Sequence, residues 1–91
     1  MRIISQDGTL DVPYENTVLY QDEKEIMCMF EGIYIGRKLA QYSTTEKVQK
    51  AMEMLREKYK DYAKATNKSN FFTMFDYPKV FQFPQDEDVE V

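Results

Sequence analysis

Residues 43–65, STTEKVQKAMEMLREKYKDYAKA, decide the fold. Ser43 followed three residues later by Glu46 is a capping box, in which each side chain can bond the other residue's backbone amide. Behind this cap, apolar side chains recur at helical spacing on one face, at Val48, Ala51, Met52, Leu55, Tyr59 and Tyr62. Charged residues take the other face, where we expect Arg56 to be exposed to solvent. The stretch therefore predicts one amphipathic helix whose apolar stripe has to be covered.

Short strands are predicted before this helix. Ile3 and Ile4 begin a strand that ends at Asp7-Gly8, a dipeptide that favours a hairpin turn. Alternating apolar residues at 10–14 follow, then residues 17–20, the continuous apolar run 26–30 and residues 39–42. The turn after residue 30 falls at either Glu31-Gly32 or Gly36-Arg37, and the pattern leaves both open.

Two aromatic segments after the helix, residues 71–75 and 79–83, predict two more strands around the turn Asp76-Tyr77-Pro78. The expected order is β-β-β-β-β-α-β-β. The fold class is therefore α+β: a small antiparallel β-meander of about five to seven short strands, with one amphipathic helix packed on it.

The 91 residues predict a single α+β domain over residues 1–84, followed by an acidic flexible tail over residues 85–91. Four acids, at positions 86, 87, 88 and 90, account for the net charge of −4, because the other 12 acidic residues equal the 12 basic residues in number. Such tails are usually solvated. We expect this one to be dispensable for folding.

Several function classes are disfavoured by composition. The chain has no histidine and one cysteine, Cys28, so the common nucleophile pairs, zinc sites and internal disulfides have no residues to form them. No basic stripe supports nucleic-acid binding, and no apolar run approaches the ~20 residues of a membrane span. We predict a non-enzymatic, cytoplasmic binding protein with no catalytic residue, no metal and no cofactor.

Arginine beside aromatic residues is the most informative combination for binding. Arg37 lies in a predicted loop beside Tyr34 and Lys38, where a guanidinium fork could bind phosphate at the lip of a site for an anionic, ring-bearing ligand. A solvated hairpin tip is the alternative. Phe71 and Tyr77 are the aromatic residues that we expect to complete the ligand site.

Phenylalanine is more abundant in the last two predicted strands than one face of a small sheet can bury. The surplus can pack against a second subunit or form a stacking platform for a base. Exposing it on a monomer would create an aggregation hazard. We therefore expect a homo-oligomer, at least a dimer, with the ligand site at or near the subunit contact.

Four phrases of the chain carry a family resemblance: residues 2–9 with 11–15, Tyr42-Ser43-Thr44, residues 50–55, and Phe81-Gln82-Phe83-Pro84 followed by acids. Together they resemble small proteins of phages and mobile elements of gut Firmicutes, and among these the first Thoeris anti-defence family. The resemblance implies an oligomeric sponge that binds a cyclic ADP-ribose signal, and in some members cyclic oligonucleotides, without cleaving it. It does not assign ligand-binding positions.

The combined prediction is a counter-defence protein, acting in the cytoplasm of an infected or lysogenic bacterial host, that sequesters a cyclic nucleotide or cyclic ADP-ribose-type signal. Two alternatives stay open. One is an inhibitor that binds a host defence nuclease through the acidic tail, in the manner of an anti-CRISPR protein. The other is a structural or accessory phage protein.

Overall fold

The predicted helix is present as α1, Thr45–Asn67, in a computed structural model that describes residues 1–30, 35–67 and 80–91. Its apolar stripe is covered, since Val48, Ala51 and Leu55 are buried. The cap is shifted by one residue from the prediction: the Thr44 hydroxyl oxygen accepts a hydrogen bond from the Lys47 amide at 3.2 Å. Thr44 is therefore the residue that satisfies the first turn of the helix.

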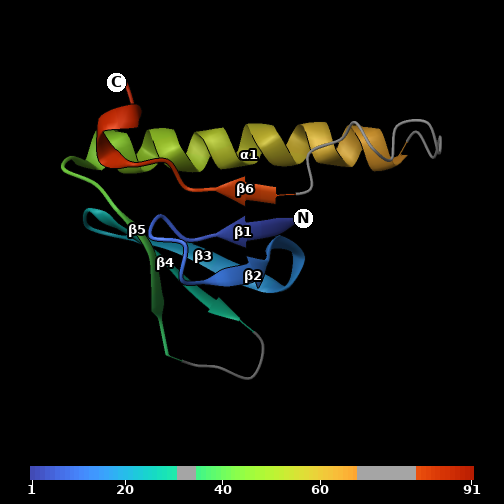
Figure 1. The fold of residues 1–91 in the computed structure, drawn as a ribbon, viewed down its shortest axis with the longest axis horizontal. Coiled ribbons are helices and arrows are strands. Elements are labelled where there is room, and N and C mark those ends of the chain that lie inside the picture. Colours follow the sequence, from blue (N-terminus) through green and yellow to red (C-terminus); the bar gives the residue numbers. More distant parts are fainter. Residues whose placement is uncertain (31–34, 68–79) are drawn as a thin grey trace.

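The first sheet joins the two ends of the chain in the order β2-β1-β6 (Figure 1). It comprises β1 (Arg2–Ile4), β2 (Asp11–Pro13) and β6 (Val80–Gln82). The predicted hairpin at Asp7-Gly8 is confirmed: β1 and β2 are antiparallel, and Gly8 has φ +79°. The pairing of β1 with β6 is parallel, so this sheet is mixed where the sequence predicts an antiparallel meander. Parallel strands need a long connection between them, and the chain between β1 and β6, which includes α1, is long enough to provide it.

The second sheet is antiparallel, in the order β3-β4-β5. A 3₁₀ turn, η1 (Tyr14–Asn16), leads from the first sheet into β3 (Thr17–Asp22), which is followed by β4 (Glu25–Phe30) and β5 (Arg37–Gln41). The pairing of β4 with β5 is irregular between Ile26 and Met27, so that Leu39 and Ala40 are both buried although they are consecutive. Such a bulge adds a residue to one strand and interrupts the alternation of its side chains.

One hydrophobic core connects the helix with both sheets. Figure 1 shows α1 lying along β6, with β1 and β2 beyond it and the second sheet crossing beneath. The buried members come from the first sheet, the second sheet, the helix and the last residues of the chain: Met1, Ile3, Val12, Ile26, Cys28, Leu39, Ala40, Tyr42, Val48, Ala51, Leu55, Phe81, Phe83 and Val89. The α+β class is confirmed, whereas the strand predicted at residues 71–75 lies outside the described residues.

The acidic C-terminal segment is docked on the domain, in contrast to the flexible tail that the sequence predicts. Residues Asp86–Asp88 form a 3₁₀ turn, η3, and Val89 is 3% exposed within the core. The Tyr42 hydroxyl donates to the carbonyl of Pro84 at 2.8 Å, and the Gln6 side-chain amide donates to the same carbonyl at 3.1 Å. Residues 84–89 are thus part of the fold.

Asp86 ties this segment to the beginning of α1. Its Oδ1 accepts from the Ser43 amide at 2.7 Å, and the Lys47 ammonium donates to its carbonyl at 2.8 Å and lies 3.5 Å from Oδ2. The hydrogen bond from the Ser43 amide, followed by the charge of Lys47, holds the pKa of Asp86 below its ordinary value. Burial raises the pKa of Tyr42 above its ordinary value.

Replacing Val89 with Asp should destabilise the domain, because it buries an unpaired carboxylate in the core. We expect a loss of about 2 kcal/mol or more, which lowers the melting temperature by roughly 10 °C in a chain of this size. Val91→Asp is the matched control, since Val91 is 73% exposed. The melting temperatures are measured by circular dichroism. Equal values for the two variants would contradict the docked segment and support the flexible tail that the sequence predicts.

The docking of Asp86 should also weaken in acid. A carboxyl whose pKa is depressed by folding stabilises the folded state above its unfolded pKa of about 3.9, and this contribution is lost as the pH falls through the folded pKa. At pH 7 the melting temperature of Asp86→Asn should therefore be lower than that of the wild type. The difference between the two melting temperatures should become smaller below about pH 4. Asp88→Asn, at an exposed position of the same turn, should show no such narrowing. A difference for Asp86→Asn that is independent of pH would contradict the assignment.

Candidate functional site

Two residues of the predicted ligand lip, Arg37 and Lys38, lie on opposite faces of β5. Arg37 pairs with Cys28 and Lys38 with Met27 in a regular part of the β4–β5 ladder. Neighbouring residues of a strand point to opposite faces of the sheet. Arg37 therefore shares the face of buried Cys28, whereas Lys38 lies on the opposite face and donates to the Gln41 side chain at 3.1 Å. Tyr34, Phe71 and Tyr77 lie outside the described residues.

The buried Cys28 thiol lies near Arg37 on this face of the sheet. Burial raises the pKa of the Cys28 thiol, and the nearby positive charge of Arg37 opposes that increase. The thiol is buried, so the apolar run at residues 26–30 contributes Ile26 and Cys28 to the core from this side of the strand. On the other side of the sheet Met27 and Met29 are only half-buried.

A groove runs between α1 and the segment formed by η1 and β3. It consists of two adjoining hollows that share Tyr14 and Arg56. The larger hollow, about 420 Å³, is lined by Tyr14, Glu53, Arg56, Glu57, Tyr59 and Lys60. The smaller hollow, about 300 Å³, is lined by Tyr14, Thr17, Leu19, Met52, Leu55 and Arg56. Both volumes fall in the lower range of small-molecule sites.

Stacked tyrosines form the aromatic wall of the larger hollow. The rings of Tyr14 and Tyr59 lie 4.2 Å apart with 26° between their planes, and Tyr62 follows at 5.7 Å from Tyr59. Tyr14 is fixed here by the 3₁₀ turn, and its amide donates to the Met1 carbonyl at 2.9 Å. The wall therefore joins the first sheet, the turn and the helix.

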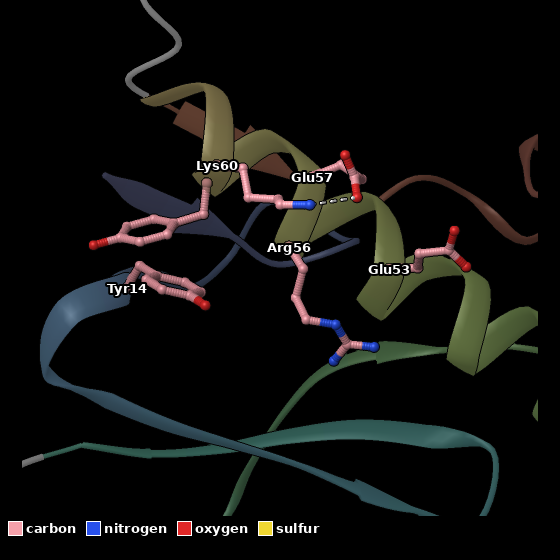
Figure 2. A pocket seen from close by; sticks show the side chains of 6 residues that line it. Tyr14, Glu53, Arg56, Glu57 and Lys60 are labelled. Carbon is pink, nitrogen blue, oxygen red and sulfur yellow. Dashed lines mark hydrogen bonds and ion pairs between the residues drawn. The ribbon is translucent and has the colours of Figure 1, made fainter. Parts of the chain in front are cut away.

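Arg56 extends over the groove without a protein partner in the described part of the chain. Figure 2 shows its guanidinium directed away from Glu53 and Glu57 and toward the strands below the helix. Glu57 is instead paired with Lys60 at 3.5 Å. An unpaired guanidinium offers a planar fork of donors to an anion. Arg56 is the one charged residue that lines the smaller hollow, so an anion held there meets no lining carboxylate.

The expectation that Arg56 is exposed is confirmed, but sequence reasoning did not connect this residue with a groove. A signal was available in the spacing: Arg56 lies four residues after Met52 and three before Tyr59. Residues at these spacings are neighbours on a helix surface. Arg56 therefore borders the apolar stripe, next to the residues that form the walls.

The described residues were expected to contain no metal site and no membrane span, and two observations bear on this. They contain no group of three or more His, Cys, Asp or Glu side chains placed to hold a metal ion. Over the same residues, no helix combines the length and apolar content needed to cross a membrane. The groove is the candidate site because it places the unpaired Arg56 guanidinium beside the ring of Tyr14.

Comparison with known proteins adds no assignment: no protein family, no curated protein and no solved structure matches this chain.

Proposed function

We propose that the protein binds an anionic, ring-bearing signal of the cyclic nucleotide or cyclic ADP-ribose type and sequesters it without cleaving it. The observation that carries the proposal is the unpaired Arg56 guanidinium beside the ring of Tyr14 in one groove. In this proposal the protein acts as a phage or prophage counter-defence sponge in the host cytoplasm, as the resemblance to the Thoeris anti-defence family implies.

The groove suits the two parts of such a ligand. Phosphate oxygens match the planar donors of Arg56, and a bidentate pair fixes orientation as well as affinity. The nucleobase of such a ligand can lie on Tyr14, where stacking on an aromatic side chain contributes about 1–3 kcal/mol per base. Neither interaction needs a catalytic group, in keeping with a chain that has no histidine.

A nuclease inhibitor acting through a free acidic tail receives less support. Asp86 is engaged with Ser43 and Lys47, and Val89 is buried, so the segment has a role within the fold. Glu87, Asp88 and Glu90 remain exposed. We therefore favour the groove over the tail as the surface that carries function.

Replacing Arg56 with Ala should abolish the main phosphate contact and weaken binding about tenfold or more, as expected for a charge-assisted hydrogen bond. Cyclic nucleotides and cyclic ADP-ribose are incubated with the protein, the protein is removed, and the ligand is recovered by heating. Wild type should deplete one of them and release it intact. Lys50→Ala, on the exposed face of the same helix, is the control and should behave as wild type.

Three outcomes would contradict the proposal. Absence of depletion by the wild type would favour a protein-binding role, tested next by nuclease inhibition. Recovery of an altered product would indicate an enzyme. If Arg56→Ala binds the ligand as tightly as wild type and Arg37→Ala binds it more weakly, the site lies at Arg37 on β5, where the sequence predicts it.

The expected homo-oligomer is part of the proposal. We place its contact on the open face of the second sheet, which is the face opposite the groove, so in this proposal the ligand site does not lie at the subunit contact that the sequence predicts. Val18 is 60% exposed there, opposite half-buried Met29, and Tyr20 pairs with Met27 on the same face. Burying such a face against a second copy removes apolar area from water at about 25 cal/mol per Å². A self-complementary patch suffices for a two-fold dimer.

Substituting Val18 with Asp should dissociate this oligomer while leaving the domain folded, because the side chain is exposed in the single chain. Light scattering at micromolar concentration gives the mass, and circular dichroism reports folding. A wild-type protein that is monomeric at this concentration would refute the oligomer. An oligomer that persists in Val18→Asp would place the contact elsewhere.

A further inference from the structure

Three lining residues of the groove follow one another along α1. Glu53, Arg56 and Tyr59 are spaced by three residues, which places neighbours in this series about 4.5 Å apart along the helix axis. Tyr59 stacks on Tyr14, and Figure 2 shows the Arg56 side chain between Tyr14 and Glu53. The order along the groove is therefore the aromatic pair, then the cation, then the carboxylate of Glu53.

The aromatic pair offers a ligand one stacking face of Tyr14. Tyr59 occupies the other face, with 4.2 Å between the ring centroids. Tyr14 also lines the smaller hollow, to which Tyr59 does not contribute. The walls there are apolar apart from Arg56 and Thr17, and the Thr17 hydroxyl donates to the Pro13 carbonyl. The groove therefore stacks one ring, and its smaller hollow has no hydroxyl free to donate to a phosphate.

The groove also offers one free positive charge. Among the described residues, two cations line it, and one of these, Lys60, is paired with Glu57 at 3.5 Å. The other is Arg56, whose side chain has no partner in the described part of the chain. Its guanidinium fork can bind two oxygens of the same phosphate. A ligand therefore finds one ring site and one phosphate site, which is the complement of a single nucleotide unit.

A second phosphate has no favourable position next to the first. With a ring on Tyr14 and its phosphate on Arg56, the aromatic side of the phosphate is filled by the ligand itself. On the opposite side lies the Glu53 carboxylate, which has no partner in the described residues and repels a like charge. In the smaller hollow a second phosphate would lose water against apolar walls, with no donor beyond the engaged Arg56.

We propose that the groove is selective for nucleotides with one phosphate group and that Glu53 is the residue that disfavours a second one. This inference rests on the proposed function and narrows its ligand to the cyclic mononucleotide class, against pyrophosphate ligands such as cyclic ADP-ribose. Tyr14 binds the base, Arg56 binds the phosphate, and Glu53 limits the charge that the groove accepts.

The probes are 3′,5′-cyclic AMP and cyclic ADP-ribose, which each contain one adenine but carry one phosphate and a pyrophosphate respectively. Isothermal titration calorimetry on the full chain at low ionic strength should show tighter binding of cyclic AMP by the wild type. Glu53→Gln should reduce this preference about fivefold, the effect of removing one like charge about 4 Å away in water. Added salt should reduce the wild-type preference, because the repulsion is exposed and therefore screened.

Asp61→Asn is the matched control. Asp61 is an exposed carboxylate on the same helix that lines neither hollow, so its replacement changes the net charge equally but should leave the preference unchanged. Circular dichroism should show both variants folded, since Glu53 and Asp61 are exposed.

Equal or tighter binding of cyclic ADP-ribose by the wild type would overturn the inference, and so would a preference that is the same in Glu53→Gln and in Asp61→Asn. If the probes bind and Arg56→Ala weakens their binding, the proposed function stands even when the inference fails. If the wild type binds neither probe, both fail together.

Discussion

The packing of the α1 stripe against two small sheets is the interaction on which the rest of the structure depends. Neither three-stranded sheet has much apolar surface of its own, and short chains bury a smaller fraction of their surface than long ones. Val48, Ala51 and Leu55 place one helix in a core that contains residues of both sheets. Without this shared core the parallel β1–β6 pair and the β3–β4–β5 sheet would have no common layer to hold them together.

The groove is a consequence of this packing. Met52, Leu55 and Tyr59 continue the stripe toward the C-terminal half of α1, where the chain below the helix is a 3₁₀ turn and the edge strand β3. The described side chains do not fill the space between them, so Arg56 and Tyr14 line a hollow and not a close contact. At the other end of α1, Asp86 bonds the Ser43 amide and the Lys47 ammonium and so ties the C-terminal segment to the beginning of the helix.

The sequence was sufficient to predict local structure, but it was not sufficient to predict how strands that are distant in sequence pair. The α1 periodicity and the Asp7-Gly8 turn depend on neighbours in sequence, and both are confirmed. The parallel pairing of β6 depends on contacts between distant residues, and the bulge that buries both Leu39 and Ala40 breaks the alternation used to assign faces. Val89 is one apolar residue among acids, so the composition of this segment predicts a solvated tail, although the Val89 side chain is buried in the core. The spacing of Arg56 places it beside the apolar stripe, but the groove itself could not be predicted, because Tyr14 and Leu19, which complete its lining, are distant from Arg56 in sequence.

The most direct test of the account is to locate a bound nucleotide on the structure by NMR. With ¹³C-methyl-labelled methionines, titration of the ligand should shift the Met52 signal, because Met52 lines the groove beneath Arg56. Met27 and Met29, on the opposite face of the second sheet, should remain unchanged and serve as internal controls. Shifts confined to Met27 and Met29, with Met52 unaffected at saturation, would contradict the claim that the groove between α1 and β3 is the binding site.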